Sequence, residues 1–475
     1  MNSSFRRKVV FISSFFAVVS MSYSITLDEY LSTVQKSNTQ FQAFELQKQS
    51  AEIKNEQADL VLSPYLIFGA KYYSDETPKP LQVFPAIIQT KSEGNEYSIG
   101  VAKKFATGTE IKAFVTEQHP RSFTATGAQP SPYLGISSFS LSQSLWKDFF
   151  GAQTRARHHR EAAATRFEKG AIEIQALQFL SQAEAAYWQL LYQKNELKVR
   201  QESLDRADRL VKWTKNRVAN GLSQSNDLLQ AEALFTQREL QFITAQDEYQ
   251  NAQLKLKDFM GAESGVPEVD VSGDLDLKRD QLVTILSAEK NMRADAWLAQ
   301  AEADLQKKVS DETTEGLRPD LVLEGAYSNL TTQDQRSDIR GHLNDGKLPN
   351  KSVALKLTMD LDFFGRSAAR RSARLNADAA SLKAGRLKSE SDRDIVESQR
   401  RYNELSRRVE AVKKLVAIQK KKYEKEQERL RNGRSTTFQV ISFEQEVAEG
   451  EVLLYKLLSE QRKIEAATRA YVGNL

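Results

Sequence analysis

Residues 145–151 read Leu-Trp-Lys-Asp-Phe-Phe-Gly, and residues 361–365 repeat the pattern as Leu-Asp-Phe-Phe-Gly. Both stretches join a strand-like segment to a long helical segment. A second motif, Arg217 to Ser223, returns as Arg429 to Ser435, 212 residues further along the chain. A duplication of this length means that one structural unit occurs twice in the fold. Most enzyme folds lack such repetition.

The first 24 residues have the features of a secretory signal peptide. Three basic residues at positions 6–8 precede an apolar run from Val9 to Val19, and residues 22–24 supply the small side chains of a cleavage site. We therefore expect the mature chain to begin near Ile25. The sequence contains no cysteine, so we expect neither a disulfide nor a lipid-anchored cysteine.

The composition argues against several classes of function. A formal net charge of +4 on a chain that is 27% charged gives no global attraction for nucleic acid. The chain has four histidines, and the adjacent His158 and His159 would point in different directions on a helix, so no metal site is expected. We find no nucleophile motif or phosphate-binding loop, and we predict that the chain is not an enzyme and needs no cofactor.

Proline-free blocks define the helical segments, since residues 133–266 and 350–475 contain no proline. From Gly151 to Ala219 apolar residues recur every seven positions, which predicts a helix packed along a seam. Roughly 68 residues at about 1.5 Å each would make a rod of about 100 Å. Gly221 and Gly433 then predict turns, each followed by a returning helix of about 38 residues.

Two shorter helical segments precede the strand regions, roughly 26–62 and 277–315. Each returning helix is little more than half as long as the outgoing rod. The shorter helices have about the missing length, so end-to-end stacking would give a helical wall of uniform length.

Apolar side chains alternate with small or polar ones in the segments near residues 66–72, 321–327 and 352–361. This alternation over about ten residues is typical of a membrane β-strand that faces lipid on one side. Long polar loops are expected at 74–95 and 329–350. The residues that we expect to face lipid are Leu66, Phe68, Tyr72, Leu321, Leu323, Val353, Leu355 and Leu357.

A further hairpin, Tyr97 to Glu117, is predicted in the first half only, with a turn at Thr107-Gly108. The chain therefore has four to six candidate strands. Single-chain membrane barrels need about eight, so we expect an oligomer.

The signal peptide, the doubled strand-plus-helix unit, the Phe-Phe-Gly junction and the Arg-x-x-x-Gly-x-Ser turn together resemble the TolC-like outer-membrane efflux protein (OEP) family. The resemblance covers essentially the whole mature chain. It implies a mostly α fold with a membrane β-barrel portion, built from an internally duplicated strand-hairpin plus long helical-hairpin unit. Three copies would form one trimeric β-barrel continued by an α-helical tunnel.

The resemblance also implies a function, a location and partners. The chain would be a passive exit duct in the outer membrane of a Gram-negative bacterium, with its tunnel in the periplasm. It would serve a tripartite efflux pump or a type I secretion system. Its partners would be two further copies, a periplasmic adaptor, an inner-membrane transporter and outer-membrane lipid. The alternative is a periplasmic coiled-coil adaptor or scaffold protein.

The domain organisation follows the repeats. We expect a signal peptide at 1–24, a first efflux repeat at 25–261, a linker at 262–277 and a second repeat at 278–475. Family barrels usually take one hairpin from each repeat. The extra segment 97–117 would therefore either enlarge the barrel from twelve strands to eighteen or fold elsewhere, and we favour twelve.

The resemblance assigns candidate sites to the ends of the helical rods. The turns would dock an adaptor, although ordinary turn chemistry explains the same residues. The docking candidates are Arg217, Gly221, Leu222, Ser223, Arg429, Gly433, Arg434 and Ser435. Asp227 matches the acidic gate residues of the family, or it stabilises a helix start. Its counterpart in the second repeat is Gln439, followed one turn later by Ser442, so the second repeat supplies no acidic ring.

Basic residues gather near the start of both long helices. They would contact phosphates of the inner leaflet, or they form an ordinary solvated helix face. These residues are Arg155, Arg157, His158, His159 and Arg160 in the first repeat, and Arg366, Arg370, Arg371 and Arg374 in the second.

Overall fold

The chain forms two compact units in a computed structural model that describes residues 24–57, 60, 62–83, 86–129, 131–261, 269–276, 293–336 and 348–472. The helical unit draws on Met1–Glu45, Ile174–Asn291 and Asp392–Asn474, and the sheet unit on Leu46–Glu173 and Met292–Ser391. The predicted signal peptide, except for Ser24, lies outside the described residues, as does most of the predicted linker.

The unit boundaries do not follow the sequence repeats, because each unit takes segments from both repeats. Three of the boundaries fall within α2 (Thr39–Gln57), α3 (Ala152–Ala219) and α8 (Phe363–Arg431). The domain limits expected from the repeats therefore stay predictions.

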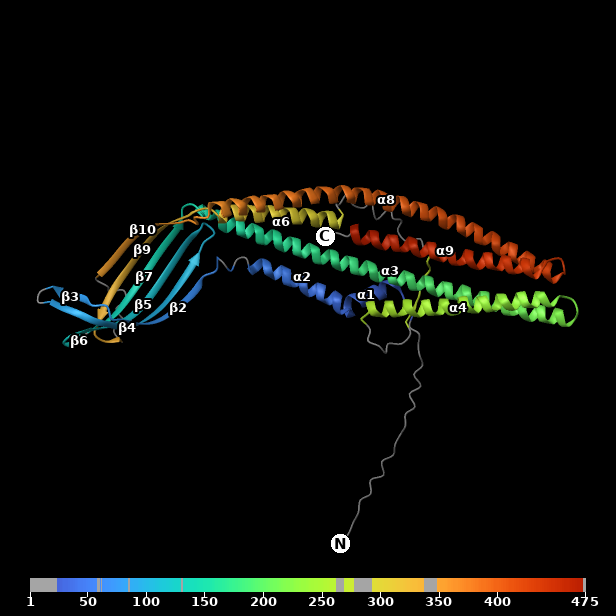
Figure 1. Cartoon of the computed structure of the whole chain (residues 1–475), viewed down its shortest axis with the longest axis horizontal. Helices are drawn as coiled ribbons and strands as arrows, with labels where there is room; N and C mark the ends of the chain where they lie inside the picture. The colour runs from blue at the N-terminus through green and yellow to red at the C-terminus, as the bar shows by residue number, and fades with distance from the viewer. Residues whose placement is uncertain are drawn as a thin grey trace, which may run out of the picture. The chain divides into compact units, whose positions relative to one another are not determined.

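The long rods and their returning helices are confirmed. Helix α3 has 68 residues and α8 has 69. The returning helices α4 (Ser225–Phe259) and α9 (Thr437–Val472) have 35 and 36 residues, slightly fewer than expected. Figure 1 shows both pairs as hairpins, α3 with α4 and α8 with α9.

The helix expected at 26–62 is two helices, α1 (Leu27–Ser37) and α2, separated by Asn38. The Asn38 Oδ1 accepts the backbone N–H groups of Gln40 and Phe41 at 2.8 and 3.1 Å, and its Nδ2 donates to the Phe259 carbonyl at 2.9 Å. Asn38 thus caps α2 and ties the break to the end of α4. Of the second expected helix, 277–315, the described part is α6 (Ala294–Gly316).

The core of the helical unit contains the heptad positions predicted for α3. Tyr30 and Val34 of α1 are fully buried beside Leu190 of α3 and Leu256 of α4. Strands β1 (Ser24–Ile25) and β8 (Asp270–Val271) pair in parallel at this core. The Tyr187 hydroxyl donates to the Ser272 carbonyl at 2.6 Å, which fixes the strand pair to α3.

The sheet unit contains one antiparallel layer with the order β10-β9-β7-β5-β4-β2 (Figure 1). Two short strands, β3 (Lys79–Val83) and β6 (Gly127–Gln129), pair with β4 and β5 respectively. The six strands of the main path are β2 (Tyr65–Asp75), β4 (Ala86–Lys104), β5 (Thr109–Thr124), β7 (Tyr133–Ser144), β9 (Asp320–Gln333) and β10 (Leu348–Thr358).

The twelve-stranded barrel that we favoured would require segment 97–117 to fold outside the sheet. That expectation is wrong. Strands β4 and β5 lie within the layer, between β2 and β7, with Ile99 opposite Val115 and Val101 opposite Ala113. The apolar pattern of this hairpin continues that of β2, since Leu66 lies opposite Val101. Matching apolar faces and backbone pairing on both sides place the hairpin within the layer.

Both polar loops were predicted too long. Strand β4 already begins at Ala86, inside the loop expected at 74–95. Strand β9 continues to Gln333, and β10 begins at Leu348. Polar side chains do not end a strand whose backbone still has a pairing partner, so composition alone misplaced these boundaries.

Two features are absent from the described residues. No helix there is both long and apolar enough to cross a membrane. No group of three or more His, Cys, Asp or Glu side chains in the same residues is placed to hold a metal ion.

Candidate functional site

The two helical turns have the same backbone geometry. Gly221 and Gly433 have φ angles of +67° and +73°. The Leu222 N–H donates to the Arg217 carbonyl and the Arg434 N–H to the Arg429 carbonyl, both at 2.8 Å. This bond, together with the bond from each glycine N–H at 3.0 Å, forms a Schellman motif at the end of each rod.

The serines after the glycines make parallel contacts at the start of the returning helices. The Ser223 hydroxyl donates to Asp227 Oδ2 at 2.6 Å, and the Ser435 hydroxyl donates to Gln439 Oε1 at 3.1 Å. Asp227 also accepts the Gln224 N–H at 3.3 Å in a capping box. Within one copy, the candidate gate residue Asp227 is thus part of a capping box and Gln439 accepts the Ser435 hydroxyl, and their role in a constriction stays a prediction.

The other predicted turn residues are near the same two turns. The Arg217 guanidinium donates to the Leu222 carbonyl at 3.0 Å and lies over the Trp213 ring. Arg429 pairs with Glu426 at 3.3 Å. The Leu222 side chain is 64% exposed, and Gly433 and Arg434 are exposed. Ser442, one turn beyond Gln439, is half-buried.

A buried ion pair connects three helices of the helical unit. Glu444 of α9 lies 3.0 Å from Arg238 of α4, and the two side chains are 4% and 1% exposed. The same carboxylate accepts from the Ser203 hydroxyl at 2.6 Å and from Arg206 of α3 at 3.1 Å. Arg238 is a charged residue within the otherwise largely apolar seam of α4, and nothing in the local sequence identifies Glu444 as its partner.

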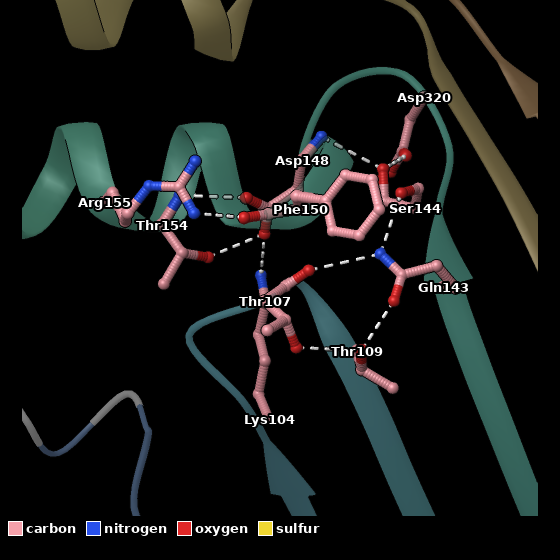
Figure 2. Close-up of polar contacts among 10 residues, drawn as sticks. All are labelled: Lys104, Thr107, Thr109, Gln143, Ser144, Asp148, Phe150, Thr154, Arg155 and Asp320. Carbon is pink, nitrogen blue, oxygen red and sulfur yellow. Dashed lines mark hydrogen bonds and ion pairs between the residues drawn. The ribbon is translucent and has the colours of Figure 1, made fainter.

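The strand-to-helix junction of the first repeat is built around Asp148 (Figure 2). Its carboxylate accepts the N–H of Thr154 at 2.9 Å and the hydroxyl of Thr154 at 2.6 Å, and it pairs with Lys104 at 2.9 Å. The Asp148 N–H donates to the Ser144 hydroxyl at 3.0 Å, which in turn donates to Asp320 at 2.8 Å. The network thus ties together the ends of β4, β7 and β9 and the start of α3.

The Phe-Phe-Gly turn follows Asp148 in an unusual backbone conformation. Phe150 and Gly151 have φ angles of +46° and +78°. A Cβ added at Gly151 would lie 1.7 Å from the Ala106 carbonyl oxygen, so only glycine fits against the β4–β5 turn. In the second repeat Asp362 accepts the Gly365 N–H at 2.7 Å, so an aspartate caps the start of each long helix.

The pKa of Asp148 is lowered in the folded chain. Burial alone would raise the pKa, but the hydrogen bonds from Thr154 and the ion pair with Lys104 outweigh it. The ionised carboxylate therefore stabilises the junction at every pH above the ordinary carboxyl pKa of about 3.9. This contribution is lost as the pH falls through the lowered folded-state pKa.

Asp148→Asn should lower the unfolding midpoint near pH 7, and the deficit relative to wild type should shrink below about pH 4. The check is guanidinium unfolding of both proteins at several pH values, followed by circular dichroism. Asp360→Asn, which changes an exposed carboxylate before the second junction, is the matched control. An equal deficit for Asp148→Asn at all pH values would show that the charge is not responsible.

Several of the clustered basic residues have partners within the sheet unit. Arg160 pairs with Glu312 at 2.5 Å, and the Arg155 guanidinium donates to the Phe150 carbonyl. Both Arg366 and Arg370 donate to the Leu317 carbonyl. These contacts favour a structural role for the four arginines over lipid binding.

The residues expected to face lipid lie on one face of the sheet. A row of directly opposed side chains crosses five strands as Leu66, Val101, Ala113, Phe139 and Tyr327. Leu355 and Leu357 of β10 lie opposite Leu323 and Leu321 of β9. Phe68 is 70% exposed and Val353 is 80% exposed, whereas Leu321 is half-buried.

Residues 133–262, from β7 through α3 and α4, match the family model described as "Outer membrane efflux protein". The resemblance to the TolC-like outer-membrane efflux proteins is thereby confirmed. The family name agrees with the predicted function, an outer-membrane efflux channel, and with the predicted location in the outer membrane. It describes channels and not enzymes, and nothing supports the adaptor or scaffold alternative.

Solved outer-membrane channels share the fold. VceC from Vibrio cholerae superposes with a TM-score of 0.66 at 14% identity, covering 94% of this chain and 96% of that chain. The Campylobacter jejuni CmeC outer membrane channel gives 0.69 at 14% identity, with coverages of 94% and 85%. The open-state MtrE outer membrane channel of Neisseria gonorrhoeae gives 0.67 at 13% identity, with coverages of 94% and 89%. No curated protein matches the chain.

These likenesses confirm the predicted fold class, mostly helical with a sheet that belongs to a barrel-and-tunnel architecture. Outer-membrane efflux proteins are trimeric channels that work with adaptors and inner-membrane pumps. The partners of this chain, the roles of its turn residues and its domain limits were predicted from sequence and stay proposals.

Proposed function

We propose that three copies of this chain form a passive exit duct across the outer membrane, fed from the periplasm by an adaptor and an inner-membrane transporter. The exposed apolar face of the six-stranded sheet carries this proposal. Large apolar side chains on β2, β4, β7, β9 and β10 are 40–80% exposed on that face. A patch of this extent is stable only against lipid or protein.

Exposed aromatic side chains flank the sheet at both strand-to-helix junctions. Trp146, Phe149 and Phe150 are 49–63% exposed, and Phe363 and Phe364 are 57% and 92% exposed. Aromatic residues commonly lie at the boundary between lipid and water. Their position at the ends of β7 and β10 supports a membrane boundary at the Phe-Phe-Gly turns.

Apolar stripes on the helices support a homotrimer. Leu229, Leu240, Ile243 and Leu254 of α4 are 49–65% exposed. Their spacing of 11, 3 and 11 residues puts them on one helix face. Such a stripe on a long helix is the surface that a neighbouring helix covers in a coiled coil. We assign that neighbour to a second copy of the chain.

The two Schellman turns are the proposed adaptor-docking surface. Each is an exposed end of a helical hairpin, and the two present the same backbone geometry with different side chains, Leu222 in one and Arg434 in the other. Two similar turns in each of three copies would offer six related sites around a ring. The docking residues are those predicted from the sequence: Arg217, Gly221, Leu222, Ser223, Arg429, Gly433, Arg434 and Ser435.

Transport needs no chemistry from the chain itself. Substrate would enter where the hairpin turns pack together, with Asp227, Gln439 and Ser442 near the constriction, and leave through the barrel. Opening would be an untwisting of the hairpins. A bound adaptor can favour the open state only by making different contacts with the two states, which places its contacts on the parts that move.

A photo-crosslinking residue at position 222 should capture the periplasmic adaptor, because Leu222 lies at the exposed turn. The matched control is position 240, where the leucine is equally exposed, 65% against 64%, but lies within α4. There we expect a crosslink to a second copy of the chain. The products are identified by mass spectrometry from irradiated cells. An adaptor found at 240 and absent at 222 would contradict docking at the turns.

A further inference from the structure

We infer that each copy contributes six strands to the membrane channel, so that three copies close an eighteen-stranded barrel in which β2 of one copy pairs antiparallel with β10 of the next. The inference rests on the proposed trimeric channel and adds its strand number and its seam. A barrel with one hairpin from each repeat would have twelve strands.

The residues of the β4–β5 hairpin pair directly with the apolar segment of the neighbouring strand β2. Its apolar residues Ile99 and Val101 lie opposite Phe68 and Leu66 of β2, and Val115 lies opposite Ile99. Ile99 and Val101 are 49% and 46% exposed, on the same face as the predicted lipid-facing residues. Each strand of the main path has at least 11 residues, enough to cross a membrane when tilted.

Two glycines allow the hairpin to pack closely against its neighbours in the sheet. A Cβ at Gly100 of β4 would lie 2.3 Å from the Phe114 ring of β5, and a Cβ at Gly69 of β2 would lie 2.4 Å from the Ser98 hydroxyl of β4. Side chains of neighbouring strands thus fill the space that a larger residue would occupy. These contacts lie on the face of the sheet opposite the apolar face. They allow β2, β4 and β5 to pack closely side by side.

The turn of the hairpin is fixed to the strand-to-helix junction. Lys104, the last residue of β4, pairs with Asp148 at 2.9 Å. A Cβ at Gly108 in the turn would lie 2.3 Å from the Asp148 carbonyl oxygen. Both the strands and the turn of the hairpin therefore make close contacts with other parts of the sheet unit. These contacts argue against a hairpin that leaves the sheet.

The two edges of the sheet fit each other across copies. Among the described strands, β2 and β10 each have a single pairing partner, and each has 11 residues. Because all neighbours on the six-strand path are antiparallel, β2 and β10 run in opposite directions. Lipid leaves no water for unpaired backbone groups, so edges within it must pair, and an even number of strands allows full antiparallel closure.

Eighteen strands would give a wider exit than twelve. The diameter of a barrel grows roughly in proportion to its strand number. At equal strand tilt, the eighteen-stranded barrel would therefore be about one and a half times as wide as the twelve-stranded one. The exit would then pass solutes that a twelve-stranded barrel with the same lining excludes.

The test uses fluorescence quenching by lipid in the full-length protein. Because the chain has no cysteine, single cysteines at Ile99, Thr116 and Leu355 can each carry one bimane label. Labelled protein is reconstituted into phosphatidylcholine vesicles with or without brominated acyl chains. Ile99 lies on the apolar face of the extra hairpin, Thr116 on its opposite face, and Leu355 on a strand that both barrel sizes contain.

We expect brominated lipid to quench the labels at Ile99 and Leu355 to similar degrees and to leave the label at Thr116 bright. Quenching at Leu355 without quenching at Ile99 would overturn the eighteen-stranded barrel and leave the proposed channel intact. An unquenched label at Leu355 would overturn the proposed channel itself. Equal quenching at Ile99 and Thr116 would contradict the assignment of faces.

Discussion

Gly433→Trp should reduce export at least about tenfold, the change that corresponds to about 1.4 kcal/mol of lost docking free energy. Gly433 has a φ of +73°, which costs other residues about 1–2 kcal/mol. A Cβ at this position would meet no atom within 4 Å, so the indole would project from the turn into the space assigned to the adaptor. Gly221 has the same geometry, and Gly221→Trp should have the same effect.

The trimer should survive both changes, because neither side chain would clash within its own copy. Gly385→Trp is the matched control, since a Cβ there also meets no atom within 4 Å but the residue lies within α8 without a positive φ. Export is measured as dye accumulation in cells lacking the native gene, and trimers are measured in outer-membrane extracts. Normal export by Gly433→Trp and Gly221→Trp would count against docking at the turns.

Glu444→Gln should destabilise the protein by about 3–5 kcal/mol, the usual cost of removing one partner of a buried ion pair. Arg238 would keep its charge in a site where its side chain is 1% exposed, and the remaining contact from Arg206 would lose its charged acceptor. The measurement is the guanidinium unfolding midpoint of the purified protein.

Glu446→Gln serves as the control, because this nearby carboxylate pairs with Lys422 at 3.0 Å but is 39% exposed. Exposed pairs contribute about 0–1 kcal/mol, so its midpoint should barely move. Replacing both partners, as in Arg238→Met with Glu444→Leu, should recover most of the loss, since no buried charge is then left without its partner. Equal unfolding midpoints for Glu444→Gln and Glu446→Gln would show that the buried ion pair contributes no more to stability than the exposed one.

The long helices could be predicted from sequence because their signals are local. The proline-free blocks, the heptad spacing of residues such as Ala183 and Leu190, and the Asn-Gly turns identified both hairpins to within a few residues. The duplicated Asp-Phe-Phe-Gly motif likewise located the start of each long helix. The break at Asn38 was missed although asparagine is a favoured helix cap, and its contact with the distant Phe259 carbonyl could not be predicted from the local sequence.

The membership of the sheet was harder to predict, because it depends on contacts between strands that are far apart in the sequence. The apolar alternation of Ile99 and Val101 was visible, but only their pairing with β2 shows that they continue its face. The buried pair of Arg238 with Glu444 was hidden for the same reason, since 206 residues separate them. A lone arginine in an apolar seam was the one signal that such a partner exists.

Disulfide formation between β2 and β10 of different copies tests most directly whether three copies close one sheet. Phe68→Cys is combined in turn with Val353→Cys, Leu355→Cys and Leu357→Cys, which lie two residues apart on one face of β10 and so sample successive registers. After oxidation of intact outer membranes, at least one pair should give covalent trimers on a non-reducing gel. Monomers from all three pairs, with the protein recovered in the soluble periplasmic fraction, would contradict the account.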